Sequence, residues 1–180
     1  MESVSRLVFF LPLILSIAFA NNVAPAAAAA DLISKTCGNA VNKQLCVKTL
    51  QADPASTNAD GAGLAAIAVN LALANATVIF SDVKKLLPAA KVAFEKQCLT
   101  DCAENYETAV GQLKDSLGAL KTKKYDDATT WIQAAMTDSE SCEEGFTERP
   151  GLKNPLAEKS TLFQQLCGNA LAIVNTLAGM

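Results

Sequence analysis

The stretch "YDDATTWIQAAMTDSESCEEGF", residues 125–146, decides the fold of this chain. Small or apolar residues recur in it at alternating intervals of three and four, which places them on one face of a helix. The residues on that face are Tyr125, Ala128, Ile132, Ala135, Ser139, Cys142 and Phe146. We therefore expect a long amphipathic helix whose apolar face packs against other helices.

Three further segments show the same spacing. Their apolar positions are Leu64, Ile67, Leu71, Ala74 and Val78, then Cys102, Tyr106, Ala109, Leu113, Leu117 and Leu120, and finally Phe163, Leu166, Ala170, Ile173 and Leu177. Asn154 and Pro155 are expected at the N-cap and first position of the last helix. The sequence therefore predicts an all-α fold, an up-down-up-down four-helix bundle over residues 61–180.

Two cysteines test this arrangement. The second and third segments meet at "KTKKY", so the turn centres near Thr122, and Cys102 and Cys142 each lie twenty residues from it. In an antiparallel hairpin the two cysteines are level, and both lie on the apolar face. We expect them to form a disulfide, which contributes roughly 4 kcal/mol by closing a loop of this size.

Two other cysteines, Cys98 and Cys167, are predicted to be unpaired thiols. Cys98 lies one turn before Cys102, and helix neighbours four apart have Cβ atoms about 5–6 Å apart, too far for a bridge. If the third connection centres near Gly151, Cys167 falls level with Thr108. That position is about 15 Å along the bundle from Cys98.

The stretch "CGNAVNKQLC", residues 37–46, holds the remaining pair. On one continuous helix Cys37 and Cys46 would be roughly 13–14 Å apart, and a disulfide needs Cα atoms within about 4.4–6.8 Å. Either they do not pair or the chain turns back between them. In a secreted chain a bridge is favoured, which predicts a disulfide-pinned helical hairpin over residues 31–58. A metal site is the alternative, but the ligand spacing and histidines are missing.

The N-terminus indicates secretion. Arg6 precedes an apolar run over residues 7–20 that ends in Ala-Phe-Ala, the pattern of a signal peptide spanning residues 1–20. An alanine-rich spacer follows to about residue 30. A membrane anchor is the alternative, but it needs about 20 apolar residues, and no later segment is expected to cross a membrane.

Composition excludes several functions. The net charge is −3, which argues against nucleic-acid binding, and the chain has no histidine. Ser-His-Asp catalysis and His-ligated zinc are thereby excluded, and no cofactor is expected. About 160 residues remain after the signal peptide, enough for one domain.

Five stretches carry a family resemblance: "LISKTCGNAVNKQLCVKTLQADP", "ALANAT", "DCAENYETAVGQL", "WIQAAMTDSESCEEGF" and "LCGNALAIVNTL". In this order, with this cysteine framework, they resemble the plant invertase/pectin methylesterase inhibitor family over Asp31 to Met180. The resemblance implies a four-helix bundle with an N-terminal hairpin and two disulfides. It also implies a stoichiometric inhibitor of the plant cell wall or vacuole, not an enzyme.

The two branches of that family differ between the second and third bundle helices. Invertase inhibitors often carry Pro-Lys-Phe there, where this chain has Lys123-Lys124-Tyr125. The missing proline, and the likeness of "CAENY" and "GFTERPGLKNP" to pectin methylesterase inhibitors, favour that branch. The expected partner is a pectin methylesterase in a 1:1 complex in the apoplast, with acid invertase as the alternative target.

The resemblance also implies where the enzyme is contacted. In the pectin methylesterase branch, polar and acidic helix faces lie over the pectin-binding cleft. The positions expected to contribute are Glu104, Asn105, Thr108, Glu140, Ser141 and Lys124. The acidic run "DSESCEE", residues 138–144, is either this contact surface or a solvated face.

Three further features remain open at this stage. Asn75 begins the glycosylation sequon Asn-Ala-Thr beside an apolar stripe, so a glycan there is possible only if its side chain faces solvent. Trp131 is either the rim of the core or an interface residue. A secreted helical carrier of a small apolar ligand is a distant alternative function, but the alternation of small and large seam residues favours a filled core.

Overall fold

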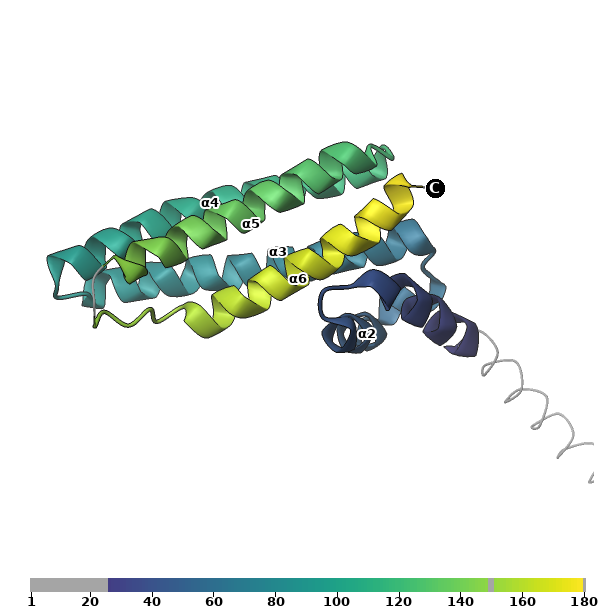
Figure 1. Ribbon diagram of the computed structural model, residues 1–180, viewed down its shortest axis with the longest axis horizontal. Helices are drawn as coiled ribbons and strands as arrows, with labels where there is room; N and C mark the ends of the chain where they lie inside the picture. Colours follow the sequence, from purple (N-terminus) through teal and green to yellow (C-terminus); the bar gives the residue numbers. More distant parts are fainter. Residues whose placement is uncertain (1–25, 149–150, 180) are drawn as a thin grey trace, which may run out of the picture.

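The computed structural model describes residues 26–148 and 151–179, and all regular structure there is helical (Figure 1). Residues 26–36 form the first helix. The other elements are η1 (Cys37–Asn39), α2 (Lys43–Ala52), η2 (Pro54–Asn58), α3 (Gly61–Leu86), η3 (Leu87–Ala89), α4 (Ala93–Lys121), α5 (Tyr125–Thr147) and α6 (Ala157–Ala178). The predicted all-α fold is confirmed, while the predicted signal peptide lies outside the described residues.

The four long helices form an antiparallel bundle. Each of α3 and α5 packs against both α4 and α6, so helices that follow one another in the sequence are neighbours and α6 returns beside α3 (Figure 1). This is the up-down-up-down arrangement that the four amphipathic segments predicted. Short connections between consecutive helices favour this topology.

The seam between α4 and α5 holds a covalent link and a buried polar network. Cys102 and Cys142 form a disulfide with their Cα atoms 4.6 Å apart. The Tyr106 hydroxyl donates to Ser160 Oγ at 2.9 Å and shares a second hydrogen bond of 2.9 Å with Ser139 Oγ. All three side chains are buried, so these bonds satisfy polar groups that would otherwise be costly and tie together α4, α5 and α6.

The prediction of which residues the first bundle helix buries is partly wrong. Ala74 and Val78 are exposed, Val78 to 50%. The helix instead buries Leu64, Ala65, Ile67, Ala68, Val69, Ala72, Ala76, Ile79 and Val83. The segment has no charged residue between Asp60 and Asp82, so no polar side distinguishes the buried face in the sequence.

The expectation that no later segment could cross a membrane also needs correction. By length and composition alone, Gly61–Ala89 is long and apolar enough to do so. In the structure α3 packs against α4 and α6, and 44% of the most apolar 18-residue window is buried. A helix that packs in the core of a bundle can be equally long and apolar, so packing explains the composition of α3.

The last helix begins later than expected. Its first residue is Ala157, and Leu156 occupies the N-cap. Asn154 does not cap the helix; its Oδ1 accepts a hydrogen bond of 2.8 Å from the Leu156 amide, as in a turn that precedes a helix. The prediction of Asn154 and Pro155 as N-cap and first helical residue is therefore wrong by two positions.

The N-terminal hairpin is pinned by a disulfide between Cys37 and Cys46, whose Cα atoms are 5.8 Å apart. The chain turns between them, at residues 40–42. The first helix also includes residues 26–30 of the expected spacer, since alanine has the highest helix propensity.

The hairpin docks on α6 through one buried amide. Asn169 Oδ1 accepts from the Asn42 backbone N–H at 2.8 Å, and Asn169 Nδ2 donates to the Asn42 carbonyl at 3.1 Å. Asn42 Nδ2 also donates to Gln165 Oε1 at 2.9 Å. Beside this clamp, a Cβ at Gly168 would lie 3.0 Å from Val41 Cγ2, so the glycine allows the hairpin turn to approach closely.

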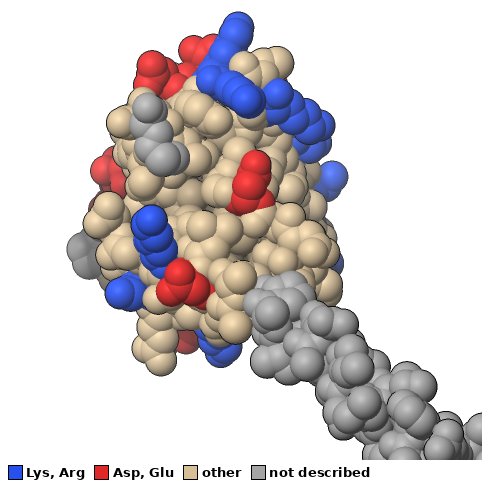
Figure 2. Space-filling view, turned by 90° about the vertical axis from the view of Figure 1, so that its right-hand side faces the viewer, with Lys and Arg blue, Asp and Glu red and all other residues tan. Residues whose placement is uncertain are grey.

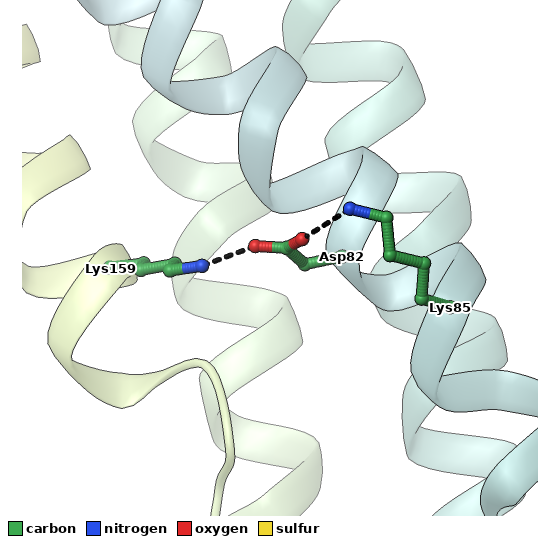
Figure 3. A network of polar contacts seen from close by, with 3 residues as sticks. All are labelled: Asp82, Lys85 and Lys159. Atoms are coloured by element: carbon green, nitrogen blue, oxygen red, sulfur yellow. Dashed lines mark hydrogen bonds and ion pairs between the residues drawn. The ribbon is translucent and has the colours of Figure 1, made fainter.

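At the opposite end of α3 an ion-pair network links two helices (Figure 3). Asp82 pairs with Lys85 on its own helix at 3.0 Å and with Lys159 on α6. The hydrogen bond from Lys159, followed by that from Lys85, lowers the pKa of Asp82. Because the group lies at the surface, solvent screens the network, and its contribution to stability is small.

Candidate functional site

Charge is unevenly distributed over the bundle. Residues 93–148, which form α4, α5 and their turn, carry twelve carboxylates and five lysines, a net charge of −7, whereas the whole chain carries −3. The remainder is therefore net positive. Figure 2 looks at the end of the bundle with the C-terminus and shows lysine side chains gathered at the upper edge, beside acidic ones. The outer surface of α4 and α5 is thus an acidic face, which we call the α4–α5 face.

Most of the residues expected to contact an enzyme lie around the disulfide on this face. Glu104 follows Cys102 by two residues and Glu140 precedes Cys142 by two, so both are close to the level of the bridge. Glu104, Thr108, Glu140 and Ser141 are exposed and Asn105 is half-buried. The hydroxyls of Thr108 and Ser141 each donate to a carbonyl of their own helix, at 2.9 and 3.0 Å, while the two glutamates make no ion pair among the described residues.

Lys124 does not join that group. It is the N-cap of α5, eighteen residues before Cys142, which is about 27 Å along the helix. Its Nζ lies 4.0 Å from Asp127, and both side chains are exposed. The structure therefore divides the expected contact residues between the disulfide level and the tip of the bundle.

The turn at that tip has a defined backbone. Lys124 N–H donates to the Ala119 carbonyl and Lys123 N–H to the Leu120 carbonyl, each at 3.0 Å, which is the Schellman pattern at a helix C-terminus. Lys123 has a φ of 58°, a left-handed conformation usually taken by glycine. The lysine-rich turn is thus held rigidly without a proline.

A half-buried acid, Asp138 at the start of the acidic run of residues 138–144, lies on the α4 side of α5. Burial raises the pKa of Asp138, and a hydrogen bond from the Gln112 side chain opposes the rise. Asp138 Oδ2 and Gln112 Oε1 are both buried without a hydrogen-bond partner in the described part of the chain. Ionised Asp138 is therefore incompletely solvated, which disfavours its charged form relative to that of an exposed aspartate.

The tyrosine and the two free thiols whose pKa values are shifted lie inside the bundle. Burial raises the pKa of the Tyr106 hydroxyl, and it raises the pKa of the Cys98 and Cys167 thiols. Both cysteines are buried and unpaired, as predicted, and a thiol of this kind is a poor nucleophile. Among the described residues no group of three or more Cys, Asp and Glu side chains could hold a metal ion.

Two residues left open by the sequence have different environments. Asn75 is half-buried on α3, and its Oδ1 is buried without a partner among the described residues. A glycan on Asn75 would require this side chain to turn outward. Trp131 is 39% exposed on α5 and lies on the α4–α5 face.

Two surface depressions lie away from the centre of the bundle. One of about 660 Å³ lies on the outer side of α2, lined by Lys43, Gln44, Val47, Lys48 and Gln51. Another of about 600 Å³ lies beside the C-terminal end of α6. A carrier would hold an apolar ligand between the helices, where Tyr106, Phe163 and Leu113 are instead fully packed. A filled bundle with an acidic face is suited to a protein that acts by binding another molecule.

Comparisons with known proteins agree with this class. The family model described as "Plant invertase/pectin methylesterase inhibitor" matches residues 31–173. "Putative invertase inhibitor" of Platanus acerifolia is 32% identical over 181 residues, covering 97% of this chain and 97% of its own length. "Pectinesterase inhibitor 28" of Oryza sativa subsp. japonica is 36% identical over 169 residues, covering 86% of this chain and 72% of its own length.

A solved structure shares the fold. The crystal structure of mutant form A of a pectin methylesterase inhibitor from Arabidopsis matches with a TM-score of 0.69 at 23% identity, covering 79% of this chain and 95% of the other. The chain belongs to the plant invertase/pectin methylesterase inhibitor family, whose members are named as inhibitors and not as enzymes. Relatives named for each of the two targets are similarly distant from it, so identity alone does not assign the target.

Proposed function

We propose that this chain is a secreted, stoichiometric inhibitor of a plant pectin methylesterase. It forms a 1:1 complex in which the α4–α5 face covers the pectin-binding cleft. The observation that carries this choice of target is the net charge of −7 on residues 93–148. A pectin methylesterase converts methyl esters of galacturonan into carboxylates, so its cleft must hold a polyanionic product. A cleft suited to a polyanion has a positive potential, which an acidic face complements.

Acid invertase, the alternative target, acts on neutral sucrose and needs no such potential. The turn of Lys123, Lys124 and Tyr125 gives further support, because it lacks the proline of the invertase inhibitors that the chain resembles. The capped left-handed backbone of this turn holds two lysines at the tip in place of that tripeptide.

Secretion to the apoplast is part of the same proposal. It is supported by the signal-peptide pattern over residues 1–20 and by two disulfides, since such bonds persist in oxidising compartments. Binding in that space would regulate the de-esterification of cell-wall pectin.

The test is a titration of residual enzyme activity with oxidised protein that lacks residues 1–20. A plant pectin methylesterase and a plant acid invertase are assayed at mildly acidic pH. We expect esterase activity to fall to its minimum near one equivalent while invertase is unaffected. Inhibition of invertase alone would assign the other target, and no inhibition of either enzyme would reject the proposal.

Charge provides an internal control for the same assay. Glu104→Lys reverses one charge at the disulfide level, and Glu158→Lys makes the same change on exposed α6. We expect only Glu104→Lys to slow association and to reduce the dependence of the rate on ionic strength. Equal effects of the two variants would show that the α4–α5 face has no special role.

A further inference from the structure

The single tryptophan of the chain is incompletely buried. Trp131 retains 39% exposure on α5, although indole is among the largest apolar surfaces that a protein can bury. Its N–H donates to no described residue, and its ring stacks on none of them. Packing within the chain therefore buries only part of the surface of this side chain.

Its position on α5 is specific. Lys124 lies seven residues before it and Asp138 seven residues after it, so the three side chains follow one line along the helix. Ser116 of α4 donates to the carbonyl of Ala128, three residues before Trp131, at 3.1 Å, and the Gln112 side chain of α4 influences the pKa of Asp138, so this line borders α4. Along the helix axis Trp131 thus lies at a level between Lys124 at the tip, about 10 Å away, and Ser141 near the disulfide, about 15 Å away.

Its surroundings indicate the kind of partner. The exposed part of the ring offers an apolar surface on two helices whose residues 93–148 carry a net charge of −7, and a partner that complements both is basic around an apolar or sugar-binding centre. The cleft of a polysaccharide-modifying enzyme has this character, because it holds both the apolar C–H faces of sugar rings and their anionic groups. Binding hot spots are also enriched in Trp and cluster near the centre of an interface.

We infer that Trp131 is the anchor of the inhibitory complex: its indole enters the polysaccharide-binding cleft of the target enzyme and joins the two groups of polar contacts into one interface. This inference rests on the proposed function and deepens it by naming the central contact. It also gives Trp131 a role that neither Glu104 nor Lys124 can supply, which is burial of apolar surface at the interface.

The first experiment measures affinity for the pectin methylesterase. Trp131→Ala should weaken binding by about 30-fold or more, the size expected of a hot spot. Trp131→Phe retains part of the packing on α5 and separates loss of fold from loss of contact. Val78→Ala, at a residue 50% exposed on α3, is the matched control and should leave affinity unchanged. A loss of less than about threefold for folded Trp131→Ala would overturn the inference.

The second experiment needs no substitution. Because the chain has one tryptophan, 5-fluorotryptophan labelling gives a single ¹⁹F resonance, whose shift between H₂O and D₂O reports solvent contact. We expect this solvent shift in the free protein and its loss in the saturated complex. A complex that inhibits but keeps the solvent shift overturns the inference and leaves the proposed function intact. A wild-type protein that does not inhibit overturns the proposed function, and the inference with it.

Discussion

Replacing Asn169 by leucine should detach the N-terminal hairpin from α6. The side chain is 3% exposed and is hydrogen-bonded to both the N–H and the carbonyl of Asn42, at 2.8 and 3.1 Å. Leucine has a similar volume, so the change leaves the Asn42 N–H unpaired without opening a large cavity, while the Asn42 carbonyl still accepts from the Cys46 N–H at 2.9 Å. One unpaired buried group costs about 1–3 kcal/mol, and the Asn42 carbonyl loses one of its two hydrogen bonds, so we expect a loss of about 1–3 kcal/mol.

The assay is urea denaturation with both disulfides intact, and the free energy of unfolding is the quantity compared. Asn175→Leu is the matched control, because its side chain is exposed on the same helix and accepts one hydrogen bond, from Thr129 at 3.1 Å. It should cost less than about 0.5 kcal/mol. If Asn169→Leu and Asn175→Leu destabilise the protein equally, Asn169 does not hold the hairpin. Faster hydrogen exchange at the Asn42 amide would locate the effect.

Three further predictions concern stability. Lys123→Gly should raise the free energy of unfolding by about 0.5–1 kcal/mol, because glycine adopts the φ of 58° without strain; a lower melting temperature would refute this. Asp138→Asn should stabilise the protein at pH 7 and have no effect at acidic pH. The reason is that the pKa of Asp138 is higher in the folded than in the unfolded state, so the wild type loses stability as the pH rises through the folded-state pKa. Melting temperatures measured across pH test it, and an effect independent of pH would contradict it. Asp82→Asn should affect stability with the opposite pH dependence, because the hydrogen bond from Lys159 lowers the pKa of Asp82. The loss, below about 1 kcal/mol, should be present at pH 6 and shrink as the pH falls below the ordinary value of 3.8; a loss that persists in acid would argue against the ion pair.

The stretch at residues 125–146 illustrates what a sequence can predict. Ala128, Ile132, Ala135, Ser139, Cys142 and Phe146 are all buried. Charged and polar residues predominate on the rest of this helix, so one face is clearly the most apolar and the period can be recognised. The same contrast made the α4–α5 pairing and its disulfide predictable from spacing alone.

The charge-free helix α3 illustrates the opposite case. With no charge between Asp60 and Asp82, several faces are apolar enough to be buried, and only packing against α4 and α6 selects one of them. Exposed Val78 could not be separated from buried Ile79 by pattern. Tertiary packing overrides the local pattern wherever the pattern offers a choice.

The candidate site could also be predicted only in part from the sequence. Glu104, Thr108, Glu140 and Ser141 were expected through family resemblance, and the structure exposes them at one level, but their separation from Lys124 depends on helix length and disulfide register. The contacts of Asp138 and Asn169 carry no local signal, because each pairs with a residue at a distance that only the fold determines. The exposure of Trp131 likewise followed from the way α5 packs.

Carboxyl footprinting tests the central claim, that the α4–α5 face covers the enzyme, most directly. Exposed carboxylates are coupled to a small amine by a carbodiimide, and modification is quantified by mass spectrometry in the free inhibitor and in its complex with a pectin methylesterase. We predict that Glu104 and Glu140 are modified in the free protein and protected in the complex, while Glu158 on α6 is modified equally in both. Protection of Glu158 with continued modification of Glu104 and Glu140 would contradict the account.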